Sequence, residues 1–231
     1  MAEHTYYTAL GHFQRRDDGP GKSRPVVIVN RKEYDLDLQE MSLWTCLNWR
    51  LLDSRQAEQH YDKLARDLLP APSRSFEDCL NRLLVRGLAA SGTGGTGFDA
   101  LYDLLSGLYI VPISESLPLR LATFCKMTLL DGTPIAQAKK LFRRDHPNDQ
   151  ERRVMKLSRQ ALLSTAELIK CVENQVYDLS SDQKVLEALY SDEYTTCDNI
   201  GAAMSAARSQ EAVTVAVASL YLRKQVIFER V

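Results

Sequence analysis

The sequence has few of the features that stabilise small secreted proteins or anchor membrane proteins. Its 231 residues include five cysteines, an odd number scattered along the chain with no close pair. We therefore expect reduced thiols rather than a disulfide framework or a zinc site. No apolar run approaches the roughly 18 residues that a membrane-spanning helix needs, and the first residues lack the pattern of a secretory signal. These absences predict a cytoplasmic protein with no membrane contact.

An excess of charge of one sign is also lacking. The chain carries 29 Lys and Arg residues and 30 Asp and Glu residues, which gives a net charge of −1. This balance removes the whole-chain argument for nucleic-acid binding. A local basic face would still be sufficient for such binding, so the distribution of the basic residues matters more than their sum.

Catalytic and metal-binding motifs are absent as well. The four histidines have neither an i, i+4 histidine partner nor a nearby cysteine that would indicate metal ligation. There is no Gly-x-Ser-x-Gly motif of a serine nucleophile. The glycine-rich segment 91–97 lacks the Lys-Ser/Thr ending of a phosphate-binding loop, and it predicts a hairpin tip or wing instead. We therefore expect a protein that is not an enzyme and that uses no catalytic residue, metal or cofactor.

The sequence does contain a clear pattern of short strands and amphipathic helices. It predicts strands over 5–10, 26–30 and 34–38, and helices over 39–52, 54–69 and 75–86. A strand at 88–91 and a helix at 98–111 follow. The segment 113–180 is predicted to be helical, with runs at 117–130 and 135–142 and one long helix over 149–174. The last residues predict helices over 181–190, from Thr196 and over 210–224, and a strand over 225–231. No internal sequence repeat is evident, and the fold class is mainly α with small β-sheets.

Two segments, 31–91 and 181–231, have the order helix, turn, helix, turn, longer helix and strand. This order resembles the winged-helix form of the helix-turn-helix regulators. The resemblance implies two winged-helix-like units joined by long helices: an N-terminal domain over 1–112, a helical linker or dimerisation region over 113–180, and a C-terminal unit over 181–231. It further implies a dimeric DNA-binding transcriptional regulator whose third helix enters the major groove.

The two candidate recognition helices differ in their outward faces. On the helix 210–224 the outward positions hold Glu211, Val215, Ala218 and Leu222, an apolar face that suits packing or a protein partner. The helix 75–86 presents Asp78, Asn81, Arg82 and Val85, and Asn and Arg are the types that read base edges and phosphates. A second basic stretch lies near Pro147. The residues expected to contact duplex DNA are Arg74, Asn81, Arg82, Arg86, Lys139, Lys140, Arg143 and Arg144.

A second interpretation needs no nucleic acid. Residues 5–86 read as three strands followed by three helices, an order that resembles the small PqqD-like winged domains. The resemblance implies capture of a peptide as an added strand at a sheet edge, with the strand 26–30 as the candidate edge. Such capture uses main-chain hydrogen bonds and needs no basic surface. The sequence thus leaves two hypotheses open: a homodimeric DNA-binding regulator, and a peptide- or protein-binding module.

Overall fold

The computed structural model describes residues 3–17, 19, 23–68, 74–113 and 147–230. These residues form a mainly helical fold with three small antiparallel sheets, each of three strands, which confirms the predicted fold class at this level. None of the described helices is long and apolar enough to span a membrane. The predicted helical runs 117–130 and 135–142 lie outside the described residues.

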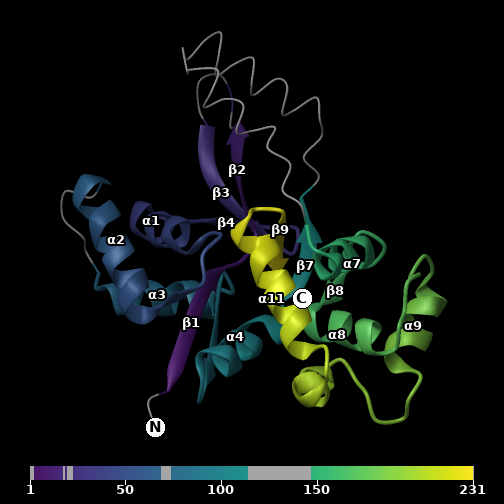
Figure 1. Ribbon diagram of the computed structural model, residues 1–231. Helices are drawn as coiled ribbons and strands as arrows, with labels where there is room; N and C mark the ends of the chain where they lie inside the picture. The colour runs from purple at the N-terminus through teal and green to yellow at the C-terminus, as the bar shows by residue number, and fades with distance from the viewer. Residues whose placement is uncertain (1–2, 18, 20–22, 69–73, 114–146, 231) are drawn as a thin grey trace, which may run out of the picture.

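The first half of the chain builds a three-helix unit around a strand that precedes all of its helices. Strand β1 is the central strand of a sheet with the order β5-β1-β6. The elements of this unit are β1 (His4–Ala9), α1 (Leu38–Leu47), β5 (Leu52–Asp53), α2 (Ser54–Leu68), α3 (Phe76–Val85) and β6 (Ala89–Gly94). Between β1 and α1 the chain inserts a second sheet, whose strands β2 (His12–Asp17), β3 (Ser23–Val29) and β4 (Lys32–Asp35) follow one another. In Figure 1, β2 and β3 project from the body of the molecule.

The second half of the chain builds a unit with the same plan. Its sheet has the order β8-β7-β9, so the strand that enters first again lies in the centre. Its elements are β7 (Tyr109–Pro112), α7 (Asp149–Ser158), β8 (Leu163–Ser164), α8 (Thr165–Glu173), α11 (Gln210–Leu222) and β9 (Val226–Glu229). Between α8 and α11 it inserts α9 (Asp182–Tyr190), α10 (Ile200–Ala203) and the short helix η3 (Met204–Ala206). We call the two units the first and second repeat.

The correspondence between the repeats extends to single residues. Helices α1 and α7 both have 10 residues, and each is followed after four residues by a two-residue strand. Tyr6 pairs with Asp53 in the first sheet, as Tyr109 pairs with Ser164 in the second. Both Asp53 and Ser164 then cap the next helix. The chain therefore contains a structural repeat without an evident sequence repeat, and the equivalent units run from β1 to β6 and from β7 to β9 rather than over 31–91 and 181–231.

The third helix of each repeat ends in the same way. The residue after its C-cap is Gly87 in the first repeat, with φ of 68°, and Lys224 in the second, with φ of 60°. This left-handed residue lets the next backbone N–H reach back into the helix: Leu88 N donates to Leu83 O at 2.8 Å, and Gln225 N to Leu220 O at 2.9 Å. The chain then turns directly into the last strand of each sheet.

Helix α4 (Gly97–Ser106) connects the repeats and packs against β6 and β1. A Cβ at Gly92 would lie 2.1 Å from the backbone nitrogen of Leu104, so this close approach requires glycine. The predicted glycine-rich hairpin tip is therefore wrong, because Gly92 and Gly94 lie within β6 beneath α4. The predicted helix 98–111 is also too long, since β7 follows α4 after two residues.

The predicted single helix over 149–174 is wrong. The helix stops at Ser158, β8 intervenes, and Ser164 caps a new helix whose Glu167 completes a capping box. Helices α7 and α8, which fall within the predicted linker 113–180, pack with α11 in the second repeat. The predicted helices 39–52, 54–69, 75–86, 181–190 and 210–224 correspond to α1, α2, α3, α9 and α11, with ends that differ by a few residues.

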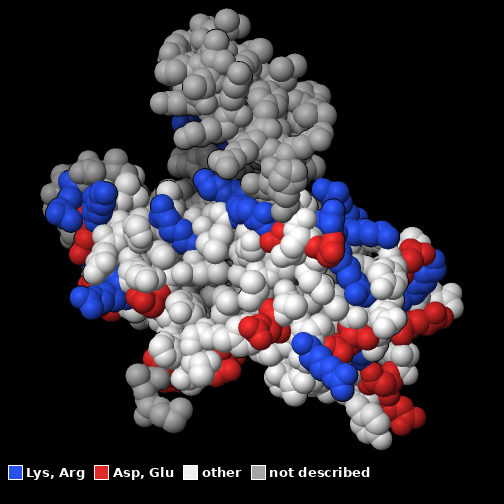
Figure 2. Space-filling model, viewed as in Figure 1, with Lys and Arg blue, Asp and Glu red and all other residues white. Residues whose placement is uncertain are grey.

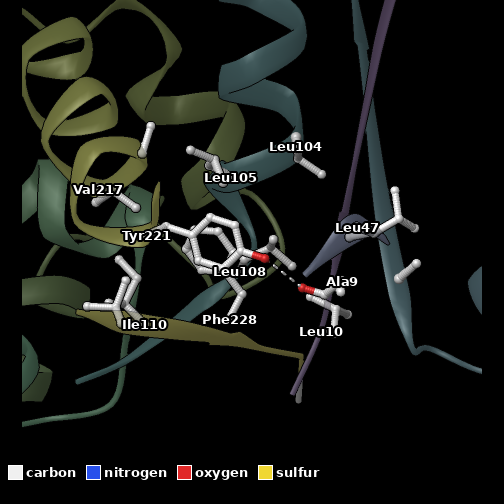
Figure 3. Close-up of a cluster of buried hydrophobic side chains, with 14 of the residues drawn as sticks. Ala9, Leu10, Leu47, Leu104, Leu105, Leu108, Ile110, Val217, Tyr221 and Phe228 are labelled. Carbon is white, nitrogen blue, oxygen red and sulfur yellow. Dashed lines mark hydrogen bonds between the residues drawn. The ribbon is translucent and has the colours of Figure 1, made fainter. Parts of the chain in front are cut away.

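Tyr221 of α11 joins the two repeats at the centre of the core. Its ring stacks on Phe228, and Figure 3 shows it among apolar side chains from both repeats and α4. The Tyr221 hydroxyl accepts a hydrogen bond from the Trp49 backbone N–H at 2.9 Å and donates to the Ala9 carbonyl oxygen at 3.4 Å. It also lies 2.8 Å from Thr8 Oγ1. Burial raises the pKa of Tyr221 to about 12, so the hydroxyl stays neutral.

We expect Tyr221→Phe to lower the free energy of unfolding by about 1–3 kcal/mol, because it leaves buried partners in the first repeat without a hydrogen bond. Urea denaturation would measure the change. Tyr194→Phe is the matched control, since Tyr194 is exposed and should tolerate the loss of its hydroxyl. Equal stability of the two variants would contradict a structural role for the Tyr221 hydroxyl.

Candidate functional site

The site that the sequence singles out lies on the outward face of α3. There the surface is hollowed by a cavity of about 450 Å³ lined by Asp78, Asn81, Arg82, Val85 and Arg86. Val85 is 88% exposed although it is apolar. The hollow thus combines polar side chains with one apolar side chain, and it is the first candidate for contact with a partner.

Helix α3 is held rigidly behind this surface. Ser75 caps it by accepting a hydrogen bond from Asp78 N at 3.1 Å, as its position in the sequence predicts. Its opposite face is buried against α1 and β6. The buried side chains of α3 are Phe76, Cys79, Leu80 and Leu83. Burial raises the pKa of Cys79 to about 11, so its thiol is an apolar packing group and not a nucleophile.

The arginines of this site are bound to one buried carboxylate. Glu40 of α1 is only 2% exposed, and Arg82 Nε donates to its Oε1 at 2.8 Å while Arg86 Nη1 donates to its Oε2 at 2.7 Å. Arg74 Nη1 lies 3.9 Å from the same carboxylate. Burial raises the pKa of Glu40, but the hydrogen bonds from Arg82 and Arg86 outweigh it, so the pKa lies below its ordinary value of 4.5. Glu40 is therefore an anion at neutral pH.

Arg74 and Arg86 have further partners. Arg74 also forms an ion pair with Asp37, the N-cap of α1. Arg86 Nη2 donates to the carbonyl oxygen of Asp35 at 2.7 Å, and its guanidinium lies 5.9 Å from the centre of the Tyr34 ring. Four residues on α3 or just before and after it were predicted to contact DNA. Three of them, Arg74, Arg82 and Arg86, are already bound to carboxylate or carbonyl oxygens. Asn81 has an exposed side chain.

The second repeat contains the same link between its first and third helices. Glu151 of α7 is buried and forms an ion pair with Arg223, the C-cap of α11. Glu40 and Glu151 both stand at the third position of a capping box, with Asp37 and Asn148 as the N-caps. Arg86 and Arg223 both follow the last residue of the third helix. Because α11 has no basic outward face, this recurrence identifies the Glu–Arg pair as part of the scaffold.

The outward face of α11 is largely as the helical wheel predicts. Glu211, Val215 and Leu222 are exposed, but Ala218 is buried. The positions that correspond to Asp78 and Val85 of α3 are occupied by Val215 and Leu222. The two repeats therefore present different surfaces on the same scaffold, a polar one on α3 and an apolar one on α11.

Strand β4 presents an outer backbone edge beside α3, on which the carbonyl oxygen of Asp35 accepts a hydrogen bond from Arg86. It follows β3 through the two-residue turn Asn30-Arg31, whose φ values of 47° and 60° are those of a type I′ hairpin. Val29 and Lys32 close this turn as a hydrogen-bonded pair. Along an antiparallel ladder, hydrogen-bonded pairs alternate with pairs that are not hydrogen-bonded. Glu33 and Asp35 stand in the second kind of pair, so their N–H and C=O groups point away from β3. The bond from Arg86 to Asp35 O shows this edge directly. Among the described strands, none pairs with β4 on this side.

The other predicted DNA contacts, Lys139, Lys140, Arg143 and Arg144, lie outside the described residues. Downstream of them, Arg152 forms an ion pair with Asp149, whereas Lys156 and Arg159 are exposed on α7. In Figure 2, Lys and Arg side chains gather along the side of this face that adjoins the grey atoms, while Asp and Glu are more frequent around α9. On the face that Figure 2 shows, the described basic residues therefore do not form one continuous surface centred on α3.

No cluster of three or more His, Cys, Asp or Glu side chains in the described part of the chain is arranged to hold a metal ion. The chain matches no protein-family model, no curated protein and no solved structure. The functional argument therefore rests on the geometry of α3 and β4. Sequence reasoning missed the role of Glu40, although the capping box Asp37-Leu38-Gln39-Glu40 carries a signal for a buried N-terminal carboxylate.

We expect Glu40→Gln to lower the free energy of unfolding at pH 7 by about 1.5–3 kcal/mol, the contribution of a hydrogen bond to a charged group. Because the pKa of folded Glu40 is lowered, its stabilisation is fully present above about pH 4.5 and is lost as the pH falls through the folded pKa. Denaturation of the wild type and the variant from pH 7 to pH 3 would measure this convergence.

Glu77→Gln is the matched control, since Glu77 is exposed on α3. Glu151→Gln should reproduce the effect of Glu40→Gln in the second repeat. A stability difference between wild type and Glu40→Gln that stays constant with pH would contradict the ion-pair role of Glu40.

Proposed function

We propose that the protein is a non-catalytic binding module that takes up an extended polypeptide segment along the outer edge of β4, beside α3. The observation that carries this proposal is the outward-facing N–H and C=O of Glu33, together with the N–H of Asp35, next to the hollow on α3. Strand addition supplies main-chain hydrogen bonds, and the hollow supplies a place for side chains of the added segment.

The chemistry of the hollow supports a polypeptide ligand. Val85 offers an apolar contact, Asn81 can both donate and accept, and Arg82 is 52% exposed although one nitrogen is bound to Glu40. A ligand side chain that is apolar or acidic fits this set. The order α1, β5, α2, α3 and β6 supports a scaffold related to the winged helix, with β1 in the place of the strand that would return from a wing.

The test compares two substitutions at the same edge position. Glu33→Pro removes the outward N–H and leaves the ladder with β3 intact, whereas Glu33→Ala keeps the N–H. Both variants lose the surface ion pair between Glu33 and Arg16, which contributes little to stability. The probe is a 12-residue peptide selected from a random library on the wild-type protein. We expect its affinity to fall about fivefold to tenfold for Glu33→Pro, the effect of one lost hydrogen bond, and to stay unchanged for Glu33→Ala.

Hydrogen exchange gives a second measurement of the same binding event. The amide hydrogen of Glu33 should become protected when the selected peptide is added, because it would then be bonded to the peptide backbone. Equal affinity of the proline and alanine variants, or an unprotected Glu33 amide in the complex, would rule out strand addition at β4.

Binding of duplex DNA by α3 is the second candidate function. The exposure of Asn81 and Arg82 on the third helix of the repeat favours it, since this helix reads the major groove in winged-helix regulators. Against it, Glu77 and Asp78 share the exposed face, and Arg82 and Arg86 already donate hydrogen bonds to Glu40. A homodimer, which would double the phosphate contacts, belongs to this candidate.

A labelled duplex of mixed sequence, titrated at two salt concentrations, tests the DNA candidate. If α3 contacts DNA, the double variant Asn81→Ala/Arg82→Gln should bind less tightly, and the slope of log affinity against log salt should fall by about 1 for the lost phosphate contact. Arg55→Gln on α2 is the control, since Arg55 is an exposed arginine on the neighbouring helix. No measurable binding by the wild type at low salt would eliminate this candidate.

A further inference from the structure

The second repeat contains a cavity near the start of its first helix. It has a volume of about 440 Å³ and lies between α7, the end of α8 and the start of α11. Its polar lining comes from Gln150 and Arg153 of α7, Glu173 of α8, and Arg208 and Ser209 before α11. The volume falls within the range of pockets that hold small molecules.

Arg153 is fixed in place, but its Nε–H is buried without a partner. Its Nη2 donates to the carbonyl oxygens of Cys171, Val172 and Val176 at 3.3–3.5 Å, where α8 ends. Its guanidinium carbon lies 4.5 Å from the centre of the Tyr177 ring. Its Nε is buried and has no hydrogen-bond partner in the structure. A buried donor without a partner is costly, so this atom is a position where a ligand would be favoured.

Gln150 provides an acceptor in the same state. Its Oε1 is buried without a partner. The corresponding residue of the first repeat, Gln39, donates from Nε2 to the carbonyl oxygen of Arg74 at 2.7 Å and so binds the segment that leads into α3. In the second repeat the chain does not run directly from the second helix to the third, because α9, α10 and η3 are inserted between α8 and α11. Equivalent glutamines thus differ in their contacts: Gln39 binds the segment before α3 in the first repeat, whereas Gln150 lines the cavity in the second.

The charges around the cavity define the ligand class. Arg153 and Arg208 are cationic, while Glu173 is anionic and accepts a hydrogen bond from Ser209 N at 2.5 Å with one oxygen. The cavity thus offers guanidinium donors for a carboxylate, and it offers Gln150 Oε1 and the Glu173 carboxylate for a neighbouring donor. We propose that this cavity binds a small carboxylate that also carries an ammonium or hydroxyl group, such as a free amino acid or a hydroxy acid.

The probes are the free amino acids and simple hydroxy acids, with acetate and inorganic phosphate as anions that lack the second donor. Each is added at millimolar concentration to the full chain, and the unfolding temperature is measured, because a ligand that binds only the folded state raises it. Calorimetry then measures the affinity of any amino or hydroxy acid that gives a saturable rise. We expect at least one such ligand, and we expect acetate and phosphate to bind at least about tenfold more weakly.

Two variants connect the binding to this cavity. Arg208→Ala removes an exposed cation and Gln150→Leu removes the buried acceptor, and each should weaken binding at least about tenfold. Arg159→Ala is the matched control, since Arg159 is exposed on α7 outside the cavity. The proposal is overturned if none of the amino or hydroxy acids gives a saturable rise, if acetate or phosphate binds as tightly, or if binding survives both substitutions. Peptide binding at β4 is measured separately, so failure of one proposal leaves the other intact.

Discussion

A buried carboxylate at the start of the first helix constrains each half of this structure. Glu40 and Glu151 lie within capping boxes, where their carboxylates accept hydrogen bonds from the backbone of the N-cap residue. A carboxylate removed from water needs a cation, and in both repeats that cation is the arginine that follows the third helix. The start of the first helix therefore lies next to the end of the third helix in space. This requirement sets where the last strand enters the sheet, and the left-handed residues Gly87 and Lys224 make that entry possible.

This constraint changes how the basic residues of α3 are understood. An arginine beside an asparagine on a third helix is typical of DNA recognition, but Arg86 has an equivalent in Arg223, on a helix whose outward face is apolar. A residue that persists while the surface around it changes serves the scaffold. Arg82 has no such equivalent, since Ser219 of α11 takes its position. Arg82 and Asn81 are therefore the residues through which the first repeat differs, and their position beside the edge of β4 fits an added strand better than a phosphate backbone.

The sequence predicted most of the elements but not how they combine. Apolar periodicity and caps such as Ser75 located α3, α9 and α11 because these signals are local.

The duplication was missed because the spacing between equivalent residues grows along the chain, from Tyr6 and Tyr109 to Arg86 and Arg223, as insertions accumulate. The apolar positions also changed size, as from Cys46 to Leu157. What remains is two capping boxes in each repeat, which are common motifs. The long helix 149–174 was predicted because Leu157, Ala161 and Leu168 keep a helical spacing across β8. The helix is interrupted there because Leu163 and Ser164 pair with β7, and this pairing leaves no mark on the apolar spacing. The Glu40 link joins residues far apart in the chain, so no local pattern could show it.

The comparison of the repeats also indicates where new function arises in a duplicated scaffold. Residues that hold the helices together cannot change without loss of stability, so the two copies diverge at the exposed third-helix positions and at the insertion points. The first repeat carries a sheet between its first strand and its first helix, and this sheet provides the edge of β4. The second repeat inserts residues between its second and third helices, and beside them Gln150 Oε1 and Arg153 Nε are buried without hydrogen-bond partners. In both copies the candidate binding surface lies beside residues that depart from the shared plan, because there a rigid scaffold meets a backbone that this plan does not specify.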